Sequence, residues 1–161
     1  MAGQAAQFAL VFERIINDTL TALDGIPDDT LNRRLELPET NSLFNLASHL
    51  LGAGEFWTLA LGAGQTVARD RAAEFSASGG AAELAGRAQR WRDGLRDLLA
   101  ALPDAALDKT VTPPTAYRGT LPEGQMTARE CLLHAIEHSA LHLGQIQITR
   151  QLLGLSAVAY S

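Results

Sequence analysis

The stretch CLLHAIEHSALHLGQIQITR, residues 131–150, decides how the rest of the chain is interpreted. It contains His134, His138 and His142 at intervals of four residues. An α-helix turns about 100° and rises about 1.5 Å per residue, so neighbouring histidines of this series share a face, where two imidazoles can bind one ion. His134 and His142 would lie about 12 Å apart, too far for bonds of about 2.0–2.1 Å to a common ion. A metal here needs two of these histidines and a ligand from elsewhere in the chain.

The hydrophobic pattern of the whole chain predicts four helices, no strands and no internal repeat. Asn41 or Ser42 is expected to cap the second helix, and Thr127 with Glu130 forms a capping box at the start of the last one. The predicted fold is all-α, a four-helix bundle formed by a single domain over residues 1–161. The predicted helices span approximately residues 4–23, 42–61, 81–102 and 127–153.

Two long connections separate these helices. Residues 62–80 are long enough to run the length of a bundle helix of about 30 Å, which allows the second and third helices to lie parallel. Residues 103–126 contain four prolines, which exclude a long helix. This second connection is either a lid over a functional site or a mobile surface loop.

Composition narrows the classes of protein. The 161 residues are 47% hydrophobic and 19% charged, as in a compact domain. A net charge of −5 makes a nucleic-acid partner unexpected. No apolar run reaches the roughly 18–20 residues that span a bilayer, and the first residues do not resemble a signal peptide. We therefore expect a cytoplasmic protein without a membrane partner, and its one cysteine, Cys131, excludes an internal disulfide.

The fourth histidine, His49, is expected on the apolar, core-directed face of the second helix. Together with a pair from residues 131–150 it would supply three neutral nitrogen ligands and leave one position open, which is typical of a catalytic metal site. Imidazole ligands suit zinc, nickel or iron(II) equally. Hydrogen-bonded core histidines are the alternative interpretation. Spacing alone leaves His134/His138 and His138/His142 both possible as the pair.

Two segments resemble one family. HSALHLGQI, residues 138–146, resembles the last-helix motif of the DinB and YfiT-like superfamily, which are metal-binding four-helix bundles related to mycothiol-dependent maleylpyruvate isomerase domains. NSLFNLASHLLGAGEFW, residues 41–57, is similar to the second-helix segment of that family. The resemblance implies a metal triad of His49, His138 and His142, an up-down-down-up bundle with the long crossover after the second helix, and a homodimer. His134 then becomes a hydrogen-bonded residue beside the ligands or in the core.

The sequence departs from the family pattern at two positions. Leu141 stands where a further histidine is frequent, and Leu143 stands where a basic residue is frequent. Neither departure removes a ligand.

The resemblance also implies a function. It suggests a thiol-dependent S-transferase, isomerase or related detoxification enzyme that uses a divalent metal and a low-molecular-weight thiol on a small-molecule substrate. A metal-dependent hydrolase is a close variant, and a non-catalytic stress-response protein that binds a metal or small ligand is the alternative. Residues expected near the ligands or the substrate are His134, Gln145, Trp91, Tyr117 and Arg118. For Trp91 a core position, and for the two loop residues a surface position, is the competing interpretation.

The last helix is apolar on the side opposite its histidines as well. A helix that is apolar on all sides is buried on more than one side, so we expect this second side to form the contact of a homodimer. The residues of this side are Leu132, Leu133, Ile136 and Leu143.

Overall fold

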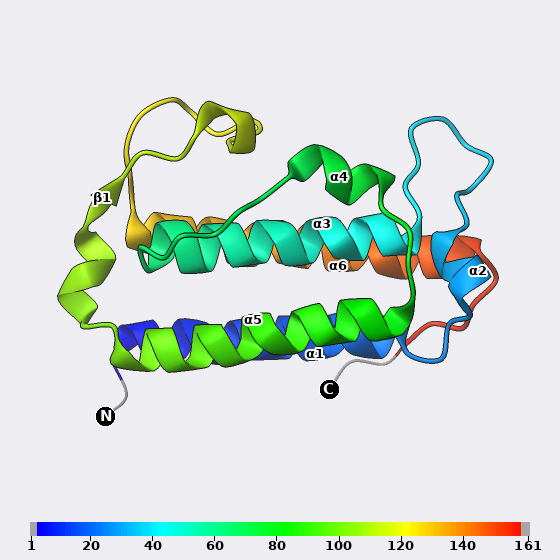
Figure 1. Ribbon diagram of the computed structural model, residues 1–161, viewed down its shortest axis with the longest axis horizontal. Helices are drawn as coiled ribbons and strands as arrows, with labels where there is room; N and C mark the ends of the chain where they lie inside the picture. The colour runs from blue at the N-terminus through cyan, green and yellow to red at the C-terminus, as the bar shows by residue number, and fades with distance from the viewer. Residues whose placement is uncertain (1–2, 159–161) are drawn as a thin grey trace.

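The computed structural model describes residues 3–158, and four long helices form its bundle (Figure 1). In Figure 1, α1 and α6 run in one direction and α3 and α5 in the other, so the order is up-down-down-up. The predicted all-α four-helix bundle is confirmed. The helices are α1 (Gln4–Leu23), α3 (Leu43–Glu55), α5 (Ala81–Ala101) and α6 (Ala128–Leu152), and the π-helix η1 (Phe56–Gly62) continues α3.

The connections contain short elements that the sequence pattern did not predict. Two are helices, α2 (Asp28–Asn32) and α4 (Arg71–Ser76), and two are 3-10 helices, η2 (Asp104–Asp108) and η3 (Thr115–Tyr117). The expectation of no strands was wrong at one place, where β1 (Thr110–Val111) pairs antiparallel with β2 (Met126–Thr127). This ladder fixes the start of α6 beside the end of η2.

The predicted helix ends are confirmed by their caps. The Ser42 hydroxyl accepts a hydrogen bond from the backbone N–H of Asn45 at 3.1 Å. Thr127 and Glu130 form the reciprocal capping box at the start of α6. After α6, Gly154 has a φ of 81°, a left-handed conformation that glycine adopts without steric cost. These caps set where the histidines lie along the bundle.

The core of the bundle contains both tryptophans. Trp91 of α5 is 1% exposed, and its ring occupies space that a Cβ at Gly54 of α3 would fill. The indole N–H of Trp91 donates to the hydroxyl of Thr58 at 3.0 Å. Trp91 is therefore a core residue, which agrees with the second of its two interpretations.

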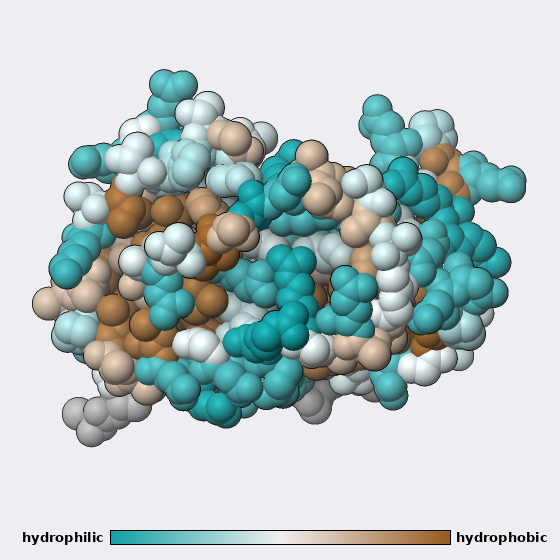
Figure 2. Space-filling model, viewed as in Figure 1, coloured by the Kyte–Doolittle hydropathy of each residue, from teal (hydrophilic) through white to brown (hydrophobic). Residues whose placement is uncertain are grey.

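The crossover between η1 and α5 runs along the outside of α3 and carries α4 (Figure 1). Glu74 of α4 is 5% exposed and lies against Gly52 of α3, where a Cβ would overlap its carboxylate. The crossover is thus packed tightly onto the helix that carries His49. Hydrophilic residues cover much of the crossover and of the outer face of α5 (Figure 2).

The predicted second side of α6 is mostly an intramolecular surface. Leu132 is fully buried, and Ile136 and Leu143 pack against the core. Three of the four residues expected at a dimer contact are therefore covered wholly or partly by the same chain, whereas Leu133 is 52% exposed, and the homodimer itself stays a prediction. The exposed apolar residues of α6 are Leu133, Leu141, Ile148 and Leu152. None of the helices within residues 3–158 is long and apolar enough to cross a bilayer.

Candidate metal centre

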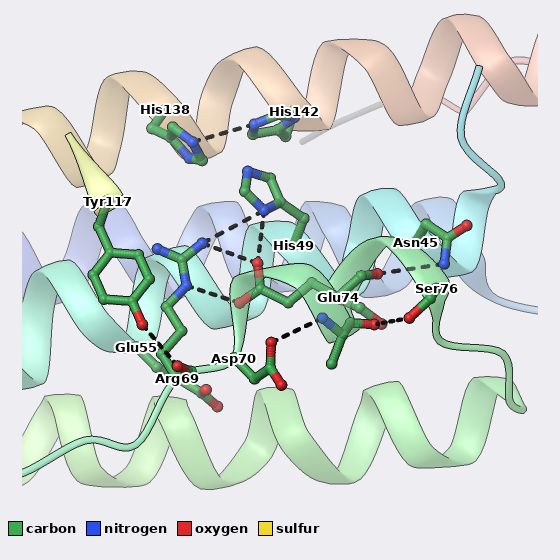
Figure 3. Close-up of polar contacts among 12 residues, drawn as sticks. Asn45, His49, Glu55, Arg69, Asp70, Glu74, Ser76, Tyr117, His138 and His142 are labelled. Atoms are coloured by element: carbon green, nitrogen blue, oxygen red, sulfur yellow. Dashed lines mark hydrogen bonds and ion pairs between the residues drawn. The ribbon is translucent and has the colours of Figure 1, made fainter. Parts of the chain in front are cut away.

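Three histidines from two neighbouring helices meet on one side of the bundle. His49 comes from the buried face of α3, and His138 and His142 project from successive turns of α6. Each offers a ring nitrogen, and these three nitrogens lie within 4.8 Å of one another. Figure 3 shows the two α6 rings pointing toward His49. The structure thus brings together the pair and the outside partner that the resemblance implied.

The spacing of the nitrogens suits a metal ion. Two nitrogens that each lie about 2.0–2.1 Å from a tetrahedral ion are about 3.3 Å apart. The Nε2 atoms of His138 and His142 are 3.3 Å apart. The three imidazoles could therefore hold a divalent ion with a small adjustment of the rings.

The two α6 histidines are neutral at ordinary pH. Burial, followed by the charges of His142 and His49, lowers the pKa of His138 to about 3. Burial and the charge of His49 lower the pKa of His142 to about 4, although its hydrogen bond to Gln145 acts in the opposite direction. A neutral imidazole keeps a lone pair for a metal, so no proton has to leave these rings when an ion binds.

Gln145 orients His142. Its side-chain oxygen lies 2.7 Å from Nδ1 of His142, and because an amide oxygen only accepts, Nδ1 carries the proton. This leaves Nε2 of His142 as the nitrogen with a lone pair. Nδ1 of His138, in contrast, is buried and has no hydrogen-bond partner among residues 3–158.

A buried ion pair lies on the other side of His49. Oε2 of Glu74 is 2.7 Å from Nδ1 of His49, and Arg69 donates to both carboxylate oxygens at 2.8 and 2.9 Å. The side chains of Arg69 and Glu74 are only 3% and 5% exposed. Burial alone would raise the pKa of Glu74, but hydrogen bonds from His49 and Arg69 outweigh it and lower that pKa. In Figure 3 this pair and the α6 histidines flank His49 from opposite sides.

A cavity of about 230 Å³ adjoins the histidines. The aromatic rings of Trp57 and Tyr117 form part of its wall, and Arg69 and Arg71 bring positive charge to it. A cavity of this volume accommodates a small molecule. Its lining residues are His49, Trp57, Arg69, Arg71, Tyr117, Arg118, Gly119, Thr120, His134 and His138.

The long loop before α6 is anchored and forms a wall of this cavity. Arg118 is 6% exposed and donates to the carbonyl oxygens of Pro113, Pro122 and Gly124. The hydroxyl of Tyr117 donates to the carbonyl oxygen of Arg69 at 2.7 Å. Both residues line the cavity, and their polar groups bind the protein's own backbone. Of the two interpretations of this loop, the structure therefore disfavours a detached surface loop.

His134 lies beside the ligands and not among them. Its ring contacts Trp57 edge to face, with centroids 4.4 Å apart, and its centroid is 5.6 Å from that of His138. Burial lowers the pKa of His134. The expected hydrogen bond is missing at Nδ1, which has no partner within residues 3–158.

The residues of the site that were not predicted from the sequence include Trp57, Arg69, Arg71 and Glu74. Trp57 lies in the π-helix η1 that continues α3, and a large aromatic side chain on a helix is more often a core residue than a cavity residue. Arg69 and Glu74 lie in the crossover, which has no periodic pattern. The sequence shows Arg69 and Glu74 only as two opposite charges five residues apart in a polar connection, and this spacing does not show that the pair is buried.

Comparison with known proteins identifies the family and agrees with the fold. A family model described as the DinB superfamily matches residues 11–146. A DinB-like protein from Bacillus cereus ATCC 10987 superimposes with a TM-score of 0.76 at 17% identity, covering 100% of both chains. A DinB-like protein from Bacillus subtilis has a TM-score of 0.69 at 18% identity, covering 96% of this chain and 97% of its own. No curated protein matches in sequence. At these identities the solved structures show the fold alone.

Proposed function

The chain belongs to the DinB superfamily, and from this premise we propose that it is a metal-dependent thiol S-transferase or isomerase that detoxifies electrophilic small molecules. The observation that supports this proposal best is the set of three imidazole nitrogens within 4.8 Å of one another, two of which belong to residues that line a cavity, His49 and His138. Three protein ligands with an open position distinguish catalytic metal sites from closed structural ones.

The charges around the site favour an anionic fourth ligand. Three neutral imidazoles leave the double charge of a divalent ion uncompensated. The nearby carboxylate of Glu74 is already paired with Arg69, and Arg71 adds a further positive charge to the cavity. A thiolate or a hydroxide would compensate this charge.

The ion, when bound, would supply the Lewis acidity that keeps a thiol in its thiolate form. The residues of the chain bind and orient the reactants. Trp57 and Tyr117 give the cavity an aromatic wall against which a small substrate can pack. In the reaction that this arrangement supports, the sulfur forms a bond to an electrophilic carbon, the leaving group departs with the electron pair of its bond, and the thiol proton passes to solvent.

Metal content tests the site. Protein purified without a polyhistidine tag should contain about one zinc, nickel or iron ion per chain by elemental analysis, as expected for a single three-ligand site. The H138A variant should lose this metal. H134A is the matched control, because His134 lies on the same helix one turn away and is not among the three converging residues. Full metal retention in H138A would exclude the proposed site.

Turnover tests the activity. Metal-loaded and chelated protein should be incubated with several low-molecular-weight thiols and a panel of electrophiles, and adducts measured by mass spectrometry. We expect metal-dependent adduct formation that H138A abolishes. The second candidate is a non-catalytic metal- or ligand-binding protein, which is favoured by the polar groups of Arg118 and Tyr117 being bonded to backbone carbonyls and so unavailable as acids or bases. Metal binding without turnover for any thiol would support that candidate.

A further inference from the structure

Glu74 makes a contact with His49 that fixes where the imidazole proton lies. The carboxylate oxygen and Nδ1 are 2.7 Å apart, and both side chains are about 5% exposed or less. At this distance a proton must lie between the two atoms, because two lone pairs would repel each other.

The proton belongs to the histidine. The guanidinium of Arg69 donates to both oxygens of Glu74, at 2.8 and 2.9 Å, so the carboxylate is one half of a bidentate ion pair and is ionised. An ionised carboxylate only accepts hydrogen bonds. Nδ1 of His49 is therefore the donor, and in the neutral ring the lone pair is on Nε2.

The ring places that lone pair toward the other two histidines. The centroid of His49 is 5.1 Å from that of His138 and 4.6 Å from that of His142, and in Figure 3 the end of the His49 ring away from Glu74 points toward the two α6 rings. A carboxylate on the far nitrogen of a metal-binding histidine fixes the ring orientation and raises its basicity. Glu74 occupies the position where such a carboxylate acts.

Arg69 holds Glu74 in this position. The contact of Arg69 with His49 itself is weak. Nη2 of Arg69 lies 3.5 Å from Nδ1 of His49, and both nitrogens carry protons, so neither can accept a hydrogen bond from the other. Arg69 is held in turn, because Tyr117 bonds to its carbonyl oxygen and its guanidinium lies 5.0 Å from the centroid of the Tyr117 ring. The crossover and the long loop thus support one face of His49.

We propose that Glu74, held by Arg69, is a positioning residue whose carboxylate fixes His49 as the Nδ1–H tautomer and presents its Nε2 lone pair to a metal. The inference about affinity rests on the proposed metal site, whereas the tautomer is a property of the metal-free protein. The two can therefore fail separately.

The tautomer is measured directly by nitrogen-15 NMR of the imidazole rings in metal-free protein. The ring signals of His49 are assigned as those that are missing from the spectrum of H49Q. In the wild type they should show the Nδ1–H tautomer. In E74A this preference should be lost, and E74Q should retain it because the amide oxygen still accepts. An Nε2–H tautomer in the wild type would overturn the proposal.

Metal affinity is measured by competition for zinc with a chromogenic chelator. E74A should bind zinc about 10–100-fold more weakly than wild type, with E74Q between them. E55Q is the matched control, since Glu55 pairs with Arg87 at 2.7 Å and bonds to none of the histidines. Wild-type affinity in E74A, or a loss without any change in the His49 tautomer, would show that Glu74 does not position the ligand. If wild-type protein binds no zinc, the proposed function is wrong. The NMR measurement of the His49 tautomer still tests the contact between Glu74 and His49.

Discussion

Gly52 decides whether the carboxylate of Glu74 can reach His49. A methyl group at this position would overlap Glu74 and lie 3.0 Å from the guanidinium of Arg87. In G52A the carboxylate must move away from the ring, and we expect weaker zinc binding and a free energy of unfolding lower by about 1–3 kcal/mol. Both are measurable, by chelator competition and by chemical denaturation.

Gly94 of α5 is the control for this substitution. It also lies inside a helix, but a Cβ there meets no atom within 4 Å. The free energy of unfolding of G94A should therefore be higher than that of the wild type by about 0.5–1 kcal/mol, because alanine reduces the conformational freedom of the unfolded chain. If G52A and G94A were stabilised equally, the carboxylate of Glu74 could move away from residue 52 without lowering the free energy of unfolding, and the prediction for G52A would be wrong.

His138 and His142 make the stability of the metal-free protein depend on pH. Burial lowers their pKa values to about 3 and about 4, against about 6.5 in an unfolded chain. Between these values the unfolded chain binds more protons than the folded one, so the free energy of unfolding falls as the pH decreases from about 6.5 toward 4. We expect a lower denaturation midpoint at about pH 5 than at about pH 7.5.

The double variant H138Q/H142Q isolates this contribution. It should lose much of the difference in midpoint between the two pH values, because neither glutamine titrates. An unchanged difference would assign the pH dependence to other groups.

Among the elements, the loop of residues 113–124 has most of its internal side-chain hydrogen bonds from one residue, Arg118. Arg118 bonds to three carbonyl oxygens of this loop and is nearly inaccessible to solvent. Hydrogen bonds to a charged group contribute about 1.5–3 kcal/mol each, so R118A should open the loop while the four long helices persist. Faster cleavage in limited proteolysis and faster amide exchange, both confined to this loop, are the expected results.

R96A serves as the comparison for the loop variant. Arg96 forms an ion pair with Asp93 on the surface of α5, with a side chain 58% exposed, and exposed pairs contribute little. Its loss should leave loop cleavage unchanged. Equal cleavage of wild type and R118A would mean that contacts other than Arg118 order the loop.

The four long helices were predictable from the sequence because α1, α3 and α5 carry periodic apolar faces and because side-chain caps mark the starts of α3 and α6. The cluster of His49 with the α6 pair followed from helix periodicity together with the family motif. The short helix α4 could not be predicted, since six residues in a polar connection are stabilised by contacts distant in sequence, as between Glu74 and His49. The residues that support the site therefore lie mainly in elements whose structure depends on tertiary packing.

For the whole molecule, we propose that the exposed face of α6 joins two copies of the chain. Leu133, Leu141, Ile148 and Leu152 are each between 52% and 60% exposed, and at 100° per residue they lie within about 100° of arc on one helix. These four residues form an interrupted apolar stripe, since the exposed Glu137 and Gln151 share its arc, and apolar side chains gathered on one exposed face mark an interaction surface. Sedimentation velocity at micromolar concentration should give a dimer, and the melting temperature should rise with protein concentration.

Substitutions on the stripe test whether the two copies associate through this face of α6 or through any exposed apolar residue. L141E with I148K should yield a monomer whose helix content is unchanged, because both side chains point to solvent in the single chain. L10E with L37E is the control, since those residues are 59% and 57% exposed but lie outside α6. A wild-type monomer would refute the dimer, and dissociation by the control pair alone would place the contact elsewhere. The stripe borders the turn that carries His134, so a partner on it would also limit the routes by which a substrate reaches the cavity.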